Sequence, residues 1–200
     1  MTIELLIVED DKKHLRDAKA EVKRQIEEGA QIKAYYAKNL KEAQEYLNGQ
    51  AIDVVISDVF FPSGMEKKEE SRIIKHLSTL LRKAFGEFTS EFDKEKERAI
   101  QEWECGRELA PLGVYIAENY KGPLVFCTST YHHGARTEPV NVYVCKKEKI
   151  GRKIGIVDDL DAGNGEAKKK KWDLALSRAL SMLDQNNKFY NNEKPNNQKR

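Results

Sequence analysis

The segment IELLIVEDD, residues 3–11, joins an aliphatic run to three consecutive acidic residues. The run is short and almost entirely aliphatic, which is typical of a strand covered on both faces of a sheet. A second segment, IDVVISDVFFP at residues 52–62, repeats this design, because its aliphatic residues lead to Asp58 and then to Pro62. The two segments predict two buried strands, each followed by acidic side chains.

The residues between these segments alternate between helix and strand patterns. Residues 12–28 place apolar side chains at helical spacing, and residues 32–36 alternate as a strand does. Asn39 and Glu42 form a capping box that opens a helix running to about Leu47. Strand, helix, strand, helix and strand in this order favour right-handed βαβ units and a parallel sheet.

This alternation stops after Pro62 and resumes after Pro111. Residues 63–112 contain no strand-like run, and they carry a wide helical stripe made of Ile73, Ile74, Leu77, Leu80, Leu81, Ala84 and Phe85. Gly86 interrupts the stripe, and Ser90 with Asp93 predicts the capped start of a second helix that passes through Trp103 to Gly106. We therefore expect a helical hairpin inserted into an α/β chain.

The last third of the chain predicts a return to the alternating pattern. We expect a helix over residues 113–120, a strand over 124–127 and a further strand over 140–145, with an irregular, Gly-rich segment over 148–165. The run of lysines at 168–171 is interpreted as the solvated first turns of a final amphipathic helix with a stripe from Trp172 to Leu183. Residues 186–200 include six asparagines, and we expect them to be disordered.

Composition excludes several classes of function. Lys and Arg number 35 against 33 Asp and Glu, a net charge of +2, and the last fifteen residues alone carry +3, so the rest of the chain sums to −1. That balance predicts no nucleic-acid partner. No apolar run approaches the roughly eighteen residues of a membrane span, and the three cysteines, without a CxxC spacing, fit reduced thiols. We expect a cytoplasmic protein that does not bind membranes.

The acidic residues predict a metal site. Glu9, Asp10 and Asp11 follow the first strand, and Asp58 ends the third. In an open parallel sheet the carboxyl ends of the strands line the ligand-binding crevice. Carboxylates that converge there repel one another unless a cation neutralises them, and Mg²⁺ is the abundant divalent ion that prefers oxygen ligands.

Two later residues complement this acidic pocket. Thr128 follows the predicted strand LVFC and offers a hydroxyl donor, and Lys146 follows the predicted strand VYVC and offers an ammonium group. A metal, a lysine and a hydroxyl can together neutralise phosphoryl oxygens while a carboxylate attacks phosphorus. The set predicts a site for a phosphoryl group.

At this point the sequence resembles the receiver domains of two-component response regulators. The resemblance covers residues 1–62 and roughly 113–184, and it rests on four segments in order: IELLIVEDD, DVVISDVFFP, GPLVFCTST and VYVCK. It implies a flavodoxin-like, doubly wound sheet of five parallel strands in the order 2-1-3-4-5. The predicted receiver domain is residues 1–185, interrupted by the hairpin at 63–112.

The resemblance also implies roles for single residues. Asp58 falls at the phosphoacceptor position, Glu9 and Asp10 at the acidic pair that holds Mg²⁺, and the carbonyl of Phe60 at a further metal ligand. Thr128 and Lys146 match the switch hydroxyl and the phosphate-pairing lysine, and Tyr143 matches the switch aromatic.

The chain departs from the family in two places that affect these assignments. Lys147 stands where the family usually has a proline, and Lys146 lies only eighteen positions after Thr128. We therefore expect the fourth helix of the receiver to be shortened or missing.

The implied function is that of a stand-alone receiver that accepts phosphate from a histidine kinase or phosphotransfer protein, with no enzymatic activity beyond loss of that phosphate. Output would be contact with a downstream protein, through residues 63–112, or formation of a homodimer. The alternative is a phosphorylation-independent interaction module in which the receiver core only supports the hairpin. An aspartyl phosphatase is disfavoured, because Phe60 stands where a second acid would be needed.

Overall fold

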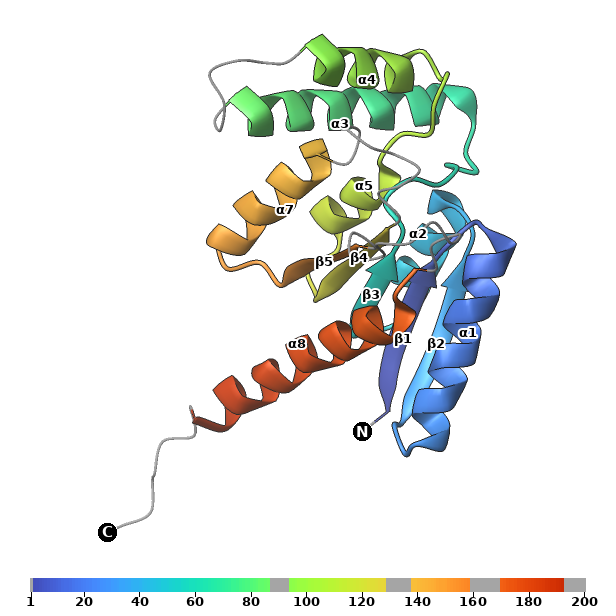
Figure 1. The fold of residues 1–200 in the computed structure, drawn as a ribbon, viewed down its shortest axis with the longest axis vertical. Helices are drawn as coiled ribbons and strands as arrows, with labels where there is room; N and C mark the ends of the chain where they lie inside the picture. The colour runs from blue at the N-terminus through green and yellow to red at the C-terminus, as the bar shows by residue number, and fades with distance from the viewer. Residues whose placement is uncertain (1, 87–93, 129–137, 159–169, 193–200) are drawn as a thin grey trace, which may run out of the picture.

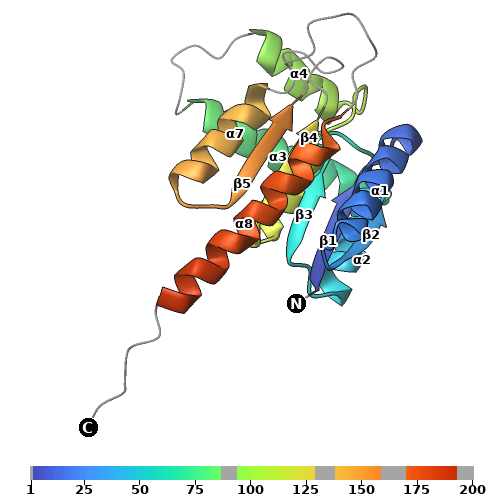
Figure 2. The same ribbon diagram turned by 60° about the horizontal axis from the view of Figure 1, so that its bottom comes forward.

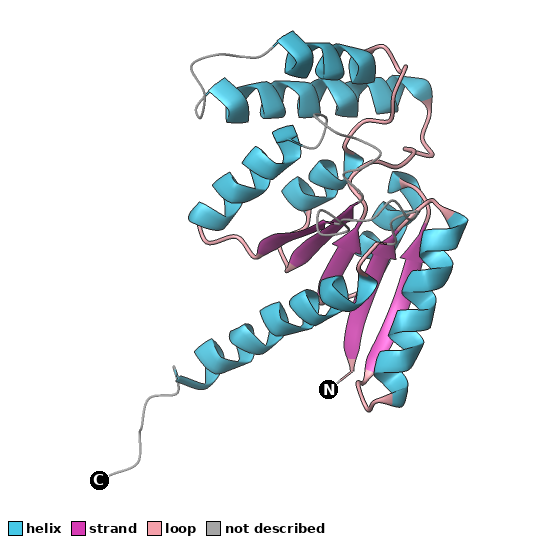
Figure 3. Cartoon of the chain, viewed as in Figure 1, coloured by secondary structure: helices cyan, strands magenta, loops and turns pink. Residues whose placement is uncertain are grey.

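The computed structural model describes residues 2–86, 94–128, 138–158 and 170–192 (Figure 1). Five parallel strands form one sheet in the order β2-β1-β3-β4-β5, with helices on both faces (Figure 3). The strands are β1 (Ile3–Val8), β2 (Ile32–Ala37), β3 (Val54–Ser57), β4 (Leu124–Thr128) and β5 (Ile154–Asp158). This is the predicted doubly wound fold with the predicted strand order.

Two hydrophobic cores lie on opposite faces of the sheet. Alternate residues of β1 divide between them, with Leu5 and Ile7 in one core and Leu6 and Val8 in the other. Helices α1 (Lys12–Glu27) and α8 (Trp172–Asn192) cover the first face, and both lie in front of the sheet in Figure 2. The second face is covered by α2 (Leu40–Gly49), α5 (Leu112–Asn119) and α7 (Glu138–Lys149).

Strand register sets where the functional side chains meet. Val8 of β1 pairs with Ser57 of β3, so Glu9 and Asp58, the next residues along each strand, leave the sheet side by side. Ser57 in turn pairs with Phe126 of β4, two residues before Thr128. The carboxyl ends of β1, β3 and β4 thus converge, as the sequence predicts.

The insertion is a helical hairpin, as predicted, and it forms a third layer. Helices α3 (Lys67–Gly86) and α4 (Lys94–Glu104) lie over α5 and α7 (Figure 1). Its stripe is buried at Ile73, Ile74, Leu77, Leu81 and Ala84, because α3 packs against α4, α5 and α7 at once. The predicted capping pair, Ser90 and Asp93, lies outside the described residues.

The strand predicted at 140–145 is wrong, because these residues belong to α7. Alternating valines favour a strand locally, but Val140, Tyr143 and Val144 have the i, i+3, i+4 spacing of one helix face, and all three are buried in the core under α3. Tertiary packing decides the outcome. The expectation of a shortened or missing fourth helix is therefore also wrong, and the fifth strand is Ile154–Asp158, inside the segment predicted to be irregular.

The last helix also differs from its predicted end. Helix α8 continues to Asn192, so residues 186–192 are helical rather than disordered. Its first half is anchored by buried Trp172, Ala175, Leu176 and Ala179, and extending an existing helix adds one hydrogen bond per residue without a new nucleus. Residues 193–200 lie outside the described part. No described helix has both the length and the apolar character to cross a membrane.

Candidate functional site

Three carboxylates gather at the carboxyl ends of β1 and β3. Glu9, Asp10 and Asp58 each offer an oxygen, and these oxygens lie within 4.8 Å of one another. Glu9 is fully buried and Asp58 is 6% exposed, whereas Asp10 is half-buried. Such a cluster of hard oxygen ligands has the chemistry of a divalent-cation site.

The third acid of the run has a different task. Asp11 is the N-cap of α1, and its Oδ1 accepts hydrogen bonds from the backbone N–H groups of Lys13 and His14 at 2.8 and 2.9 Å. These bonds lower the pKa of Asp11. Asp11 fixes the start of the helix, and only Glu9 and Asp10 of the run join the acidic cluster.

A buried lysine completes the cluster. The Nζ of Lys170 lies 2.6 Å from Oε2 of Glu9 and 2.6 Å from Oδ2 of Asp58, and its side chain is 3% exposed. Lys170 stands just before α8, where its carbonyl accepts a hydrogen bond from the N–H of Trp172. The start of α8 therefore aims the ammonium group at the strand ends.

Burial dominates the electrostatics of this pocket. It raises the pKa of Glu9 to about 7, against the opposing effect of Lys170, and the charge of Asp58 adds to the rise. Burial and Asp58 also raise the pKa of Asp10. Burial alone would lower the pKa of Lys170, but the adjoining carboxylates of Asp58 and Glu9 outweigh it and raise that pKa. The lysine is charged, and its single positive charge faces three carboxylates, so it cannot neutralise all of them.

Thr128 lies at the end of β4, as predicted, and is 1% exposed. Its Oγ1 is buried and makes no hydrogen bond to the residues that the structure describes. An unsatisfied buried hydroxyl costs free energy, so such a group needs a ligand or another compensation. Its place at the strand end beside β3 suits a donor to a group attached at Asp58.

Lys146 and Tyr143 are not where the sequence places them. Both belong to α7 rather than to the fifth strand. The hydroxyl of Tyr143 donates a hydrogen bond of 2.6 Å to Glu118, and the described part of β5 carries no aromatic side chain. The assignment of Lys146 as the phosphate-pairing lysine is therefore corrected, because the lysine beside Asp58 is Lys170. The assignment of Tyr143 as the switch aromatic loses its basis, because Tyr143 does not lie on the fifth strand.

Two signals in the sequence could have identified Lys170. The segment KIGIVD at 153–158 contains a short aliphatic run of the same kind as the first strand. Lys170 then lies between the fifth strand and the last helix, after the strand as expected but twelve positions beyond its end at Asp158. The run of lysines at 168–171 concealed it, because its members are identical in sequence and only the fold distinguishes the buried one.

The loop after Asp58, residues 58–63, is held from several sides. The Asp58 N–H donates to the Val8 carbonyl, and the Val59 N–H donates to Oδ1 of Asp58 at 2.6 Å. The Phe60 side chain is buried in the core shared with the hairpin and contacts the Trp103 ring at 6.2 Å between centroids. The carbonyl of Phe60 as a metal ligand stays a prediction.

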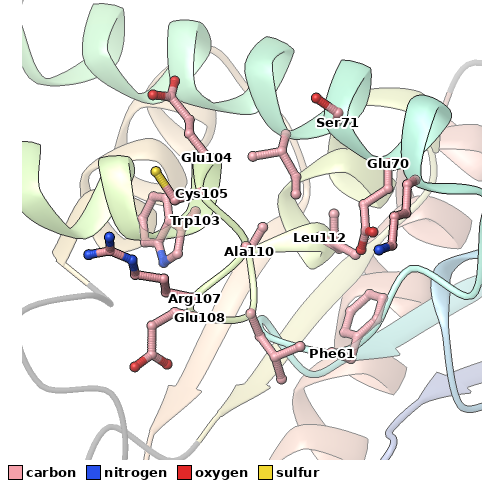
Figure 4. A pocket seen from close by; sticks show the side chains of 14 residues that line it. Phe61, Glu70, Ser71, Trp103, Glu104, Cys105, Arg107, Glu108, Ala110 and Leu112 are labelled. Atoms are coloured by element: carbon pink, nitrogen blue, oxygen red, sulfur yellow. The ribbon is translucent and has the colours of Figure 1, made fainter.

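A cavity of about 580 Å³ lies at the root of the hairpin rather than at the acidic cluster (Figure 4). Trp103, Ala110 and Leu112 line it together with Phe61 from the acceptor loop, while Lys67 and Arg107 contribute charged side chains. At the acidic cluster, Lys170 bridges two of the three carboxylates, those of Glu9 and Asp58. The two features share the loop that follows Asp58.

Comparison with known proteins finds likeness only in the backbone. No family model and no curated protein matches the sequence. A signal receiver domain from Vibrio parahaemolyticus aligns with 96% of this chain and 98% of its own, at 12% identity and a TM-score of 0.49. The receiver domain of Francisella response regulator 1452 aligns with 92% and 99%, at 15% identity and a TM-score of 0.47. A signal receiver domain from Pseudomonas fluorescens aligns with 92% and 99%, at 12% identity and a TM-score of 0.46.

Proposed function

We propose that this chain is a signal receiver that takes a phosphoryl group on Asp58 in a Mg²⁺-dependent reaction. The observation that carries the proposal is the contact of Lys170 Nζ with Asp58 and Glu9, 2.6 Å in each case. A buried lysine, three convergent carboxylates and the buried Thr128 hydroxyl, which has no partner among the described residues, form a set that matches the needs of an aspartyl phosphate.

Each residue has a stated task in this proposal. An oxygen of the Asp58 carboxylate attacks phosphorus, forming an acyl phosphate as the bond from phosphorus to the donor's nitrogen or oxygen breaks. The ammonium of Lys170 and the hydroxyl of Thr128 hydrogen-bond phosphoryl oxygens, and Lys170 also compensates the buried charge of Glu9. Glu9, Asp10 and Asp58 would hold Mg²⁺, which supplies positive charge to the phosphoryl oxygens when bound.

The donor proposed is a phosphohistidine on a kinase or a phosphotransfer protein. Hydrolysis of the acyl phosphate would return the carboxylate and inorganic phosphate. Output would pass to a partner protein, and the hairpin constrains where that partner can bind: the α3 stripe is buried inside the molecule, so a partner on the insertion would meet its polar outer side, where Arg98 and Lys75 are exposed.

The direct test is incubation with Mg²⁺ and acetyl phosphate, followed by intact-mass measurement. The wild type should gain one labile phosphoryl group, and Asp58→Asn should gain none. Omission of Mg²⁺ should abolish the gain. A folded wild type that binds Mg²⁺ yet gains nothing from acetyl phosphate or from any phosphorylated histidine donor would contradict the proposal and favour the phosphorylation-independent module.

A further inference from the structure

The inserted hairpin contacts the loop after Asp58, residues 58–63, at two points. At the end of this loop, the hydroxyl of Ser63 donates a 2.8 Å hydrogen bond to Glu70 in the first turn of α3. On the far side, the Phe60 ring lies against the Trp103 ring of α4, with centroids 6.2 Å apart and planes inclined by 48°. Both rings are almost fully buried, so this contact is part of the core rather than a surface approach.

The start of α5, which follows the hairpin, contacts the same loop. The N–H of Gly113 donates a 3.0 Å hydrogen bond to the Val59 carbonyl. A Cβ at position 113 would lie 2.5 Å from the Asp58 carbonyl oxygen, so only glycine allows this approach. Further contacts come from the start of α2, where the N–H groups of Leu40 and Lys41 donate to the carbonyls of Pro62 and Ser63. The loop thus has little room to shift unless Phe60 and Trp103 shift with it.

We infer that the inserted hairpin is a working part of the acceptor site, in which Trp103 positions Phe60 and, through it, the backbone of Asp58. This inference rests on the proposed function. Since the Asp58 carboxylate accepts from the adjacent Val59 N–H, its orientation depends on the same short backbone segment that Phe60 anchors. Preorganised geometry of this kind contributes to the rate of group transfer, and a small displacement lowers it.

The coupling works in both directions. A change at Asp58 that moves the loop must also disturb the Phe60–Trp103 contact, because well-packed cores transmit displacement rather than absorb it. Trp103 lies on α4, which packs on α3, and α3 packs on α7. The hairpin is therefore placed to report the state of Asp58 to surfaces remote from it.

Rates of phosphorylation by acetyl phosphate test the positioning role. Trp103→Leu should lower the rate by about fivefold, the scale of an aromatic pair, and Trp103→Phe, which keeps a ring, should restore most of it. The matched control is Leu81→Ala, which also removes buried volume from the hairpin but near the other end of α3. Equal rates for folded Trp103→Leu and Leu81→Ala would overturn the inference.

A spectroscopic readout separates this inference from the proposed function. The protein has two tryptophans, and their indole N–H groups give two signals in a ¹H–¹⁵N spectrum. Trp172, two residues after Lys170, should shift on phosphorylation and so report the event itself. Trp103 should shift with it in the wild type and stay fixed in Phe60→Leu.

The outcomes are distinct. Phosphorylation with a shift of Trp172 but none of Trp103 in the wild type would overturn the coupling alone. Absence of any phosphoryl gain by mass would overturn both the proposed function and the coupling that depends on it. A Trp103 shift that persists unchanged in Phe60→Leu would show that the signal does not pass through the ring contact.

Discussion

Lys170 and Arg82 each contact two carboxylates, but an acid beside Lys170 has its pKa shifted in the opposite direction from the acids beside Arg82. Lys170 holds Glu9 and Asp58 with a side chain that is 3% exposed, and Arg82 holds Glu97 and Glu104 with one that is 34% exposed. The distances differ little, at 2.6 Å for both lysine contacts and 2.8 and 2.9 Å for the arginine contacts. Burial is the main difference.

That difference reverses the direction in which the pKa of Glu9 is shifted, compared with the pKa values of Glu97 and Glu104. Hydrogen bonds from Arg82 lower the pKa of Glu97 and of Glu104, so these carboxylates are stabilised as anions. Burial raises the pKa of Glu9 to about 7 in spite of Lys170, so this carboxylate is held as an anion at a cost. The contacts of Arg82 link α3 to α4, whereas the contacts of Lys170 hold an ammonium group and two carboxylates together where a ligand can bind.

Replacing Lys170 should have the largest effect. Lys170→Met should slow phosphorylation by acetyl phosphate by about a hundredfold, the scale for loss of one charged donor to a reacting group. It should also tighten Mg²⁺ binding, because a positive charge leaves the acidic cluster. The matched control is Lys146→Met, which alters the lysine that the sequence singles out and should leave both quantities unchanged. The reverse pattern, with Lys146 essential and Lys170 dispensable, would break the assignment.

Titration of Mg²⁺ binding against pH sharpens the contrast. Metal binding needs ionised carboxylates, and the pKa of Glu9 is about 7 while that of Asp10 is also raised. Affinity should therefore fall by about tenfold per pH unit below 7 for each proton that competes. Without metal, the raised pKa of Glu9 means that its contribution to stability falls as pH rises from about 4.5 to 7.

Calorimetric titration from pH 5 to pH 8 measures the Mg²⁺ affinity, and Glu9→Gln supplies the control, since its affinity should be weaker at pH 8 and depend less on pH. An affinity independent of pH below 7 would contradict the electrostatic account.

Thr128→Val tests the unpaired hydroxyl with a change of nearly the same shape. Because Oγ1 makes no hydrogen bond in the described structure, the substitution should leave the free energy of unfolding unchanged or raise it slightly. Phosphorylation should nevertheless slow by about tenfold, the scale of a hydrogen bond to a charged group. Urea denaturation and the rate assay give the two values. A large loss of stability would mean that Thr128 already has a structural partner.

The smallest effect should come from the exposed cluster. Arg82→Met should lower the free energy of unfolding by about 1 kcal/mol or less, since ion pairs in contact with solvent contribute little. The loss should shrink as pH falls through the lowered pKa values of Glu97 and Glu104, because the ion pairs stabilise the fold only while these carboxylates are charged. The rate of phosphorylation should not change; a marked fall would show that the hairpin is held in register by Arg82 and not by its apolar core.

The sequence predicts β1, β3 and β4 because each is a short aliphatic run, and it predicts β2 because its residues alternate as a strand does. IELLIV and VVIS have no helical periodicity, and the acidic residues after them mark the functional edge. The site residues Glu9, Asp10, Asp58 and Thr128 follow from these strand ends alone. The hairpin is also predicted, because its stripe keeps helical spacing from Ile73 to Ala84.

The fifth strand is a different case, since two segments compete for it. VNVYVC has the stronger local strand pattern, but its valines and Tyr143 become a helix face that packs under α3. Such packing against an insertion cannot be read from local periodicity. The wrong strand also led to the wrong lysine. A strand ending at Cys145 would put Lys146 at the site, whereas the observed strand ends at Asp158 and the lysine that contacts Asp58 is Lys170.

A crystal structure of the protein with Mg²⁺ and beryllofluoride, a stable mimic of the phosphoryl group, tests the central claim most directly. The account predicts beryllium on an oxygen of Asp58, Mg²⁺ bound by the acidic cluster, and a fluoride within hydrogen-bond distance of both Lys170 Nζ and Thr128 Oγ1. An adduct contacted by Lys146, or crystals in which Asp58 stays unmodified and Lys170 keeps its present contacts at saturating ligand, would contradict it.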